Sequence, residues 1–339
     1  MRVSQNPSLK PFNTFGVQAS AGLMITLENE EDLLSLPPFN PERDLILGGG
    51  SNVLFVSDIP GTVFQNRLTG KAIVEKHDDH AWIEVGAGEK WHQLVRWTLD
   101  HGLTGLENLS LIPGLAGAAP IQNIGAYGVD LAAVLETVTA WDLARNTWTT
   151  FTLPQCELSY RDSLFKSGEP GRYLICSIRL RLDTQFAAKM DYTGLRDELS
   201  RAGIEKPSAL DVSDAVVRLR QSKLPDPAVT GNAGSFFKNP VLKQGRADSL
   251  IDLFPGLPAW PLGADEVKLS AAWMIERCGF KGHREGDAGV SDKHALVIVN
   301  NGSASGQQIF KLAGDIQASV HSTFGILLEP EPRIVNFVS

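Results

Sequence analysis

Residues 112–128, IPGLAGAAPIQNIGAYG, constrain the fold of this chain more than any other stretch. Eight of these seventeen residues are glycine or alanine, and none is charged. Glycine permits a positive φ and a close approach of the backbone to a ligand, and a run of exposed peptide N–H groups can bind an anion without lysine or arginine. The stretch therefore predicts either a main-chain loop around a phosphate-bearing cofactor or a small-residue packing turn.

A second glycine-rich segment, residues 48–52, lies between predicted strands at residues 44–47 and 53–56. A Rossmann dinucleotide fingerprint would need a helix after the glycines and a third glycine at Val53, so the sequence disfavours that fold. The turn can still present N–H groups to a pyrophosphate, or it can be a hairpin without a ligand.

Hydrophobic periodicity predicts most of the other elements. Strands are predicted at residues 62–65, 81–86, 134–143, 148–153, 174–182 and 295–299. Helices are predicted at residues 28–36, 91–101, 193–202, 212–222, 269–278 and 307–324. Ser213 is the predicted N-cap of the fourth helix. Short strands, glycine turns and few long helices together predict an α+β fold, and the two prolines in residues 224–227 mark a domain boundary.

Composition argues against several classes of protein. The chain has 339 residues and a net charge of −8, which disfavours a nucleic-acid binder because such a protein shows a basic face. No apolar run approaches the roughly 20 residues that span a bilayer, and the N-terminus has no apolar signal core, so we expect a cytoplasmic protein without a membrane partner. The three cysteines match neither a disulfide framework nor a zinc pattern, and no metal site is expected.

Residues 231–240, GNAGSFFKNP, are the sharpest local signal for chemistry. Two glycines and an asparagine predict a tight turn just before Ser235, and two aromatic residues follow it. A serine in such a partly dry place could give a proton to a carbanion if the site orients it. The motif is not a nucleophile elbow, because G-x-S-x-G fails at Phe237. A serine that only caps or turns the chain is the alternative.

Residues 159–166, SYRDSLFK, group Tyr160, Arg161 and Asp162. Arginine forms bidentate pairs with carboxylates and phosphates, which makes Arg161 a candidate ligand for an anionic substrate. Arg161 could equally pair with Asp162 as part of the surface.

Three charged residues, Glu329, Glu331 and Arg333, alternate along the segment LEPEPRI. The intervening prolines keep their predecessors extended, and a period of two then points the three side chains to one side. The segment is either a solvated edge strand or a rigid support for an acid and a carboxylate-binding arginine.

Six segments occur together and in order, namely GGGSNVLF, GLENLSLIPGLAGAAPIQNIGAYG, YRDSLFK, KLPDP, GNAGSFFKNP and LEPEPR. As a set they resemble the UDP-N-acetylenolpyruvoylglucosamine reductase (MurB) family, in its longer type I form, over nearly the whole chain. The resemblance implies an FAD enzyme of peptidoglycan synthesis. NADPH would reduce the flavin, and the flavin N5 would pass hydride to UDP-N-acetylglucosamine enolpyruvate, which gives UDP-N-acetylmuramate.

The fold that this resemblance implies is the two-subdomain FAD-binding architecture of the PCMH or vanillyl-alcohol-oxidase type, followed by a C-terminal α+β substrate-binding domain. The expected FAD-binding subdomains are residues 1–70 and 71–223, and the expected substrate-binding domain is residues 224–324. The tail, residues 325–339, is expected to return to the second subdomain. The protein is expected to be a monomer that acts on a small UDP-sugar.

The resemblance also assigns residues to roles. Ser235 would protonate the α-carbon, and Arg161 and Glu331 would stabilise the negative charge that grows on the α-carbon and the carboxylate. The implied substrate-binding residues are Tyr160, Tyr192, Lys223, Asn239 and Arg333. The implied FAD-binding residues are Gly48, Gly49, Gly50, Ser51, Asn52, Val53, Pro113, Gly114, Gly117, Ala118, Ala119, Ile121, Ile124, Gly125 and Tyr127.

Two other functions remain open from the sequence. An FAD-dependent sugar or alcohol oxidase of the same fold would tend to use a histidine for covalent attachment of the flavin, and His101 is the candidate near the glycine loop. A nucleotide-sugar sensor without catalysis is the other, although the presence of Ser235, Arg161 and Glu331 together argues against it.

Overall fold

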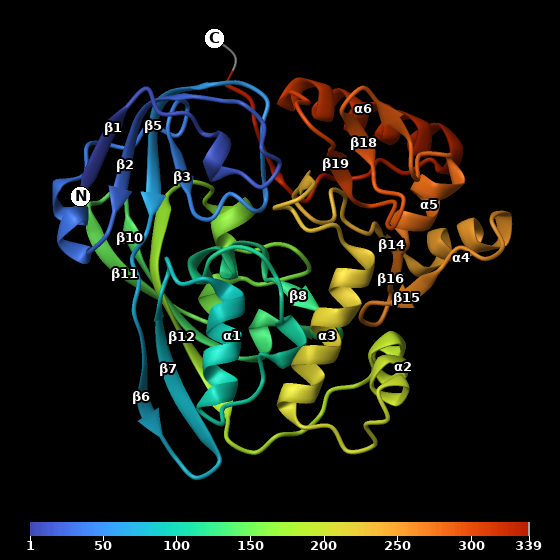
Figure 1. Ribbon diagram of the computed structural model, residues 1–339, viewed down its shortest axis with the longest axis horizontal. Coiled ribbons are helices and arrows are strands. Elements are labelled where there is room, and N and C mark those ends of the chain that lie inside the picture. Colours follow the sequence, from blue (N-terminus) through green and yellow to red (C-terminus); the bar gives the residue numbers. More distant parts are fainter. Residues whose placement is uncertain (338–339) are drawn as a thin grey trace. The chain divides into compact units, whose positions relative to one another are not determined.

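In the computed structural model, which describes residues 1–337, the chain is divided between two units (Figure 1). Unit 1 comprises Met1–Pro7, Ala21–Gly49 and Ile59–Gln221, and unit 2 comprises Ser8–Ser20, Gly50–Asp58 and the residues from Ser222 onward. Helices and strands occur in both units, which confirms the predicted α+β content. The bounds of the functional domains, including the destination of the tail, stay predictions.

The first sheet of unit 1 has the strand order β1-β2-β5-β3. The strands are β1 Arg2–Gln5, β2 Ala21–Leu27, β3 Leu45–Leu47 and β5 Ile59–Asn66. β2 and β3 run parallel to β5, whereas β1 is antiparallel to β2. Pro60 and Gly61 are poor strand formers, which is why the sequence predicted only residues 62–65 of β5.

The second sheet of unit 1 is antiparallel, with the order β11-β10-β12-β7-β6 (Figure 1). Its strands are β6 Lys71–Lys76, β7 His80–Gly86, β10 Leu135–Asp142, β11 Thr147–Thr152 and β12 Tyr173–Asp183. Side chains alternate between the two faces of a strand. Ile178 and Leu180 of β12 are therefore buried in the core, while Arg179 and Arg181 point the other way.

Helix α1, Trp91–Asp100, packs against this sheet in one core through Leu94 and Val95, which are fully buried. Its apolar residues lie three to four positions apart, and this spacing places them on one side of the helix. Helices α2, Thr193–Arg201, and α3, Ala209–Lys223, contribute to a separate small core.

Unit 2 contains a four-stranded sheet of order β13-β19-β18-β17 and a three-stranded sheet of order β14-β16-β15. Their strands are β13 Gly231–Asn232, β14 Val241–Lys243, β15 Ala259–Pro261, β16 Glu266–Leu269, β17 Arg284–Glu285, β18 Ala288–Val290 and β19 Ile298–Asn300. The helices are α4 Gln244–Leu253, α5 Ala271–Arg277 and α6 Gly306–Phe324. β4, Val53–Phe55, pairs in parallel with β20, Arg333–Val335. None of the helices among the described residues combines the length and the apolar character needed to cross a membrane.

Most predicted elements are confirmed to within a few residues, but two interpretations are wrong. The glycine turn at residues 48–52 is not a hairpin, because β3 pairs with β5 and β4 pairs with β20. Ser213 is not an N-cap, because α3 begins at Ala209 and Ser213 is buried inside it. Ser208 takes that place, since its hydroxyl accepts a hydrogen bond from the Asp211 N–H at 3.2 Å.

Candidate active site

The glycine- and alanine-rich loop, residues 112–128, is fixed to the chain that leads into α1. The Trp91 N–H donates to the Gly114 carbonyl at 3.1 Å, and the Ala116 N–H donates to the Glu89 carbonyl at 2.8 Å. Two short 3-10 turns follow, Ala116–Ala118 and Pro120–Gln122. Of the predicted cofactor-binding residues, Ala118 and Ile121 lie in these turns, Ala119 lies between them and Ile124 follows the second. The predicted loop is confirmed as local structure, and it has an ordered backbone without a charged side chain.

Gly117 occupies a place in this loop that has no room for a side chain. Its N–H donates to the Ala87 carbonyl at 2.9 Å, and a Cβ on Gly117 would overlap the Cβ of Ala87. We expect Gly117→Ala to lower the free energy of unfolding by about 1–3 kcal/mol, the usual cost of overpacking, and to weaken FAD binding. Thermal unfolding and flavin content measure both effects. Gly314→Ala in α6 is the control, because its new Cβ meets nothing within 4 Å and a helical alanine stabilises by roughly 0.5–1 kcal/mol.

The two glycine-rich segments meet within unit 1. A Cβ on Gly49 would lie 3.3 Å from the Gly114 Cα, and a Cβ on Gly48 would lie 3.7 Å from the Leu115 Cδ1. Gly48 and Gly49 thus lie against the loop, which is the proximity that a shared cofactor requires. The other predicted residues of this turn, Gly50, Ser51, Asn52 and Val53, belong to unit 2, where Val53 opens β4.

Arg161 is attached to the far end of the same loop. Its Nη2 donates to the Gly125 carbonyl at 2.7 Å, and its Nη1 lies 3.4 Å from the Asn123 carbonyl. Arg161 has a φ of +57°, so the turn holds it in a conformation that non-glycine residues seldom adopt. Asp162 accepts hydrogen bonds from Ser163 and Ser167 at 2.8 and 2.6 Å. These contacts favour a role for Arg161 at the loop over a surface pair with Asp162.

Arg220 on α3 is a candidate that the sequence analysis missed. Its Nε is buried and makes no hydrogen bond to another described residue. Burial lowers the pKa of the Arg220 guanidinium, and the nearby charge of Arg161 acts in the same direction, whereas the Tyr127 hydroxyl opposes them. The signal was present in the sequence, because position 220 continues the four-residue spacing of the buried Val212 and Val216. A buried cation beside an uncharged loop is suited to an anionic ligand.

Tyr127 lies near Arg220, and two further tyrosines of the predicted site contact Tyr127 or Arg161. The rings of Tyr127 and Tyr192 meet edge to face, with centroids 4.9 Å apart. The Arg161 guanidinium carbon lies 5.6 Å from the centre of the Tyr160 ring. Tyr192 precedes α2 and is 41% exposed. Tyr160 and Tyr192, which were predicted as substrate-binding residues, therefore lie close to predicted cofactor-binding residues of unit 1.

Within unit 2, hydrogen bonds fix the backbone on both sides of Ser235. The Gly234 N–H donates to the Asn232 side-chain oxygen at 2.9 Å, and Gly234 has a φ of +72°. The Phe236 N–H donates to the Leu296 carbonyl at 2.7 Å, and the Phe236 ring is 1% exposed. Ser235 itself is half-buried. The predicted tight turn is confirmed, and it fixes the backbone from which the hydroxyl projects.

Glu331 lies on the strand-like segment next to this serine turn. Its N–H donates to the Phe236 carbonyl at 2.8 Å, and its own carbonyl accepts a hydrogen bond from the Asn52 side chain at 3.3 Å. The Arg333 N–H donates to the Asn52 carbonyl at 3.0 Å. The structure therefore brings Ser235, Glu331, Arg333 and the glycine-turn residue Asn52 together on adjacent backbone segments of unit 2.

The remaining predicted substrate-binding residues also lie in unit 2. The Asn239 side-chain oxygen accepts a hydrogen bond from the Ala271 N–H at 3.0 Å, at the start of α5. Lys223 ends α3. His294 is close enough to Lys223 that this charge, after burial, helps to lower the pKa of the histidine. Lys238 pairs with Glu329 at 2.6 Å, so Glu329 is occupied as a surface ion pair.

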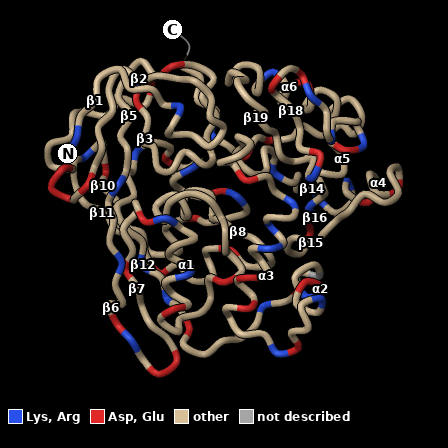
Figure 2. The backbone as a smooth tube through the Cα atoms, in the orientation of Figure 1, with Lys and Arg blue, Asp and Glu red and all other residues tan. Residues whose placement is uncertain are grey.

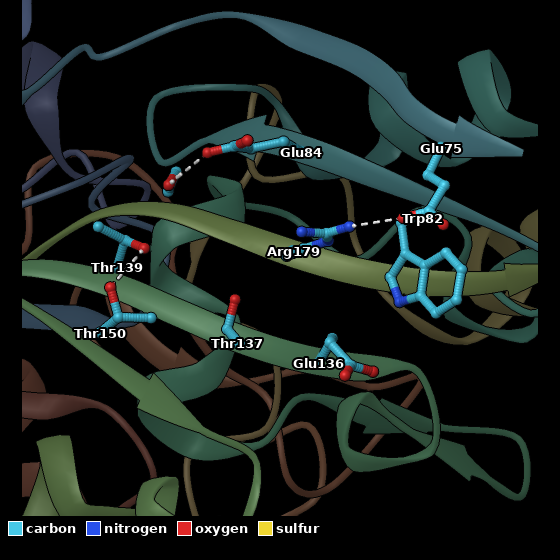
Figure 3. Close-up of a pocket in the computed structure, with 9 residues that line it drawn as sticks. Glu75, Trp82, Glu84, Glu136, Thr137, Thr139, Thr150 and Arg179 are labelled. Carbon is cyan, nitrogen blue, oxygen red and sulfur yellow. Dashed lines mark hydrogen bonds and ion pairs between the residues drawn. The ribbon is translucent and has the colours of Figure 1, made fainter.

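A hollow of about 450 Å³ lies elsewhere in unit 1, on the outer face of the second sheet (Figure 3). Three carboxylates, four hydroxyls and the side chains of Trp82 and Arg179 line it, and Arg179 reaches Glu75 at 3.4 Å. No residue of the glycine loop contributes to it. Charged side chains of both signs are spread over both units (Figure 2). The hollow is lined by three carboxylates, whereas the glycine loop carries no charge, so the hollow is not the candidate site.

Two family models match this chain. Residues 226–335 match the family model described as UDP-N-acetylenolpyruvoylglucosamine reductase, C-terminal domain, and residues 23–151 match that of an FAD binding domain. The protein called UDP-N-acetylenolpyruvoylglucosamine reductase in Xanthomonas oryzae pv. oryzae (strain PXO99A) is 47% identical over 98% of this chain and 96% of its own length. The protein of the same name in Pseudomonas aeruginosa PAO1 is 45% identical over 98% of this chain and 99% of its own length.

A solved structure gives the same result at the level of the fold. The crystal structure titled UDP-N-acetylenolpyruvylglucosamine reductase (MurB) from Thermus caldophilus matches with a TM-score of 0.68 and 25% identity, and the match covers 99% of this chain and 100% of that chain. The predicted fold class, an FAD-binding fold followed by a second α+β domain, is confirmed. Because the relatives match at 45–47% identity over nearly the whole length, the chain belongs to the UDP-N-acetylenolpyruvoylglucosamine reductase family.

Proposed function

We propose that this chain is an NADPH-dependent flavoenzyme that reduces UDP-N-acetylglucosamine enolpyruvate to UDP-N-acetylmuramate, a precursor of peptidoglycan. The observation that supports it most is the ordered, uncharged loop of residues 112–128 with the Arg220 guanidinium buried nearby. A buried cation suits the diphosphate or the anionic reduced ring of FAD, and the loop carries no charged side chain that would oppose it. When bound, FAD would accept hydride from NADPH and deliver it to the enolpyruvyl group.

The proposed roles of the side chains follow from where charge develops. Hydride addition to an enol ether conjugated with a carboxylate puts negative charge on the α-carbon and the carboxylate oxygens. Arg161 as a fixed cation, and Glu331 in its protonated form or through a water, would stabilise that charge, because fixed donors act strongly where water is excluded. Ser235 would give its hydroxyl proton to the α-carbon, and the turn at Gly234 would hold the hydroxyl in position.

The UDP-sugar would be held by Tyr160, Tyr192, Lys223, Asn239 and Arg333. A lysine suits the diphosphate and an arginine suits a carboxylate or phosphate in a bidentate manner. NADPH as the reductant, a cytoplasmic location and a monomeric state belong to the same proposal.

The direct test is the purified protein with its expected substrates. We expect a yellow preparation that oxidises NADPH when the enolpyruvyl substrate is present and that forms UDP-N-acetylmuramate. Denaturation should release the flavin into solution. A flavin that stays on the polypeptide, together with turnover of an alcohol or sugar, would favour the oxidase, and absence of any turnover would favour the sensor.

Replacing Lys223 with alanine is expected to raise the KM for the UDP-sugar by roughly tenfold or more and to change kcat little. A contact to a phosphate remote from the reacting carbon stabilises the ground state and the transition state alike, so its loss appears mainly in KM. Steady-state kinetics measure both constants. Lys243→Ala is the control, because Lys243 is an exposed lysine of β14 that pairs with Glu266 at 3.2 Å. A large fall in kcat for Lys223→Ala would contradict the binding role.

A further inference from the structure

The residue just before the glycine loop is held by a histidine that no assigned role covers. Leu111 has a φ of +58°, a region that residues with a side chain seldom adopt. Its N–H donates to the His92 Nδ1 at 3.0 Å. His92 is the second residue of α1, next to Trp91, whose own N–H donates to Gly114 in the loop. One short segment of α1 thus fixes both the entry into the loop and its first glycine.

This contact fixes the protonation state of the imidazole. A nitrogen that accepts a hydrogen bond carries no proton, so Nδ1 is bare and the ring is neutral with its proton on Nε2. In the imidazolium form both nitrogens donate, and the Leu111 N–H would then face another N–H. Protonation of His92 therefore removes the partner that holds Leu111 in its unusual conformation.

The groups around His92 also favour its neutral form. Burial is the largest influence that lowers the pKa of His92 below its ordinary value of 6.5, and two cations add to it, Arg96 on the same helix and Arg220 on α3. Asp214 on α3 opposes them, although its carboxylate is already paired with Arg96 at 2.7 Å. The folded protein therefore keeps the ring neutral across the neutral pH range.

We propose that His92 is a positioning residue for the FAD site. Its neutral imidazole ring holds the entry of the loop at residues 112–128, so that the protein retains FAD less tightly in acid. The inference rests on the proposed binding of FAD by this loop. The sign of this pH dependence follows from the lowered pKa of His92. A histidine with a lowered pKa contributes fully above about pH 6.5, and the contribution is lost as the pH falls through the lowered value.

The test uses the holoenzyme, diluted at a series of pH values between about 5 and 8 and followed by the fluorescence of released FAD. His92→Asn places a carbonyl oxygen near the position of Nδ1 and cannot titrate, whereas His92→Phe keeps a ring without any acceptor. We expect the FAD Kd of the parent protein, relative to that of His92→Asn, to rise on the order of three- to tenfold toward acid, the range for one hydrogen bond. His92→Phe should bind FAD weakly by a similar factor at every pH.

Parallel pH profiles for the parent protein and His92→Asn would overturn the inference and leave the proposed function intact. A parent protein that binds no FAD at any pH would overturn both, so the two failures are distinguishable. Other groups that titrate contribute equally to the parent protein and to His92→Asn, so the ratio of their Kd values isolates His92. That comparison also decides the matter if His92→Phe fails to fold.

Discussion

Ser235→Ala is expected to slow reduction of the enolpyruvyl group by about 10²- to 10⁴-fold, the usual contribution of a positioned proton donor. Reduction of the flavin by NADPH should remain largely intact, because that half-reaction needs no proton at the α-carbon. The turn that presents Ser235 is formed by the Gly234 and Phe236 backbone and makes no use of the hydroxyl, so the fold should persist. Rapid mixing of the oxidised enzyme with NADPH, and of the reduced enzyme with substrate, measures the two half-reactions separately.

Ser249→Ala is the matched control for this experiment. Ser249 is also a serine of unit 2, but its hydroxyl donates to the Gly245 carbonyl within α4, away from the serine turn in the sequence. We expect this variant to retain both half-reactions. Equal losses in the two half-reactions of Ser235→Ala would contradict the role of proton donor and would indicate a general disturbance of the site.

Arg220→Met is expected to raise the thermal stability of the apoprotein and to lower its affinity for FAD. Without a ligand, the buried Nε lacks a partner, so an apolar side chain of similar length should raise the thermal stability of the apoprotein. With FAD, the variant loses a charged hydrogen-bond donor, which typically contributes about 1.5–3 kcal/mol, so we expect FAD to bind roughly 10- to 150-fold more weakly. The flavin reduction potential should also fall, because a cation nearby stabilises the anionic reduced ring.

Arg220→Lys separates charge from geometry. Lysine keeps the positive charge but has no Nε at the same place, so it should retain most of the reduction potential and recover only part of the FAD affinity. Thermal unfolding of the apoprotein, flavin fluorescence and a potentiometric titration give the three readouts. A less stable apoprotein together with unchanged FAD affinity for Arg220→Met would show that Arg220 serves the packing of α3 alone.

The local features of the chain could be predicted because nearby residues decide them. Glycine and alanine in residues 112–128 permit one kind of backbone, and the asparagine and glycines before Ser235 permit one kind of turn. The helices were predicted where apolar residues recur every three to four positions, as in α1 and α6. The short strands β14, β15 and β16 escaped prediction because each has only three or four residues, too few to show a period.

The amino-acid sequence therefore establishes the character of each segment and, through the ordered set of motifs, the family. Which segments meet becomes visible only in the folded chain. β4 pairs with β20, although most of the chain separates them in sequence. Gly117 must be glycine because Ala87 fills the space that a side chain would need. Ser213 is buried inside α3, where it makes hydrogen bonds with Ser110 and Arg96. Arg220 and His92 gain their proposed roles in the same way, since the partner or burial that defines each comes from a distant part of the sequence. Such contacts depend on packing between elements, which short-range periodicity does not encode.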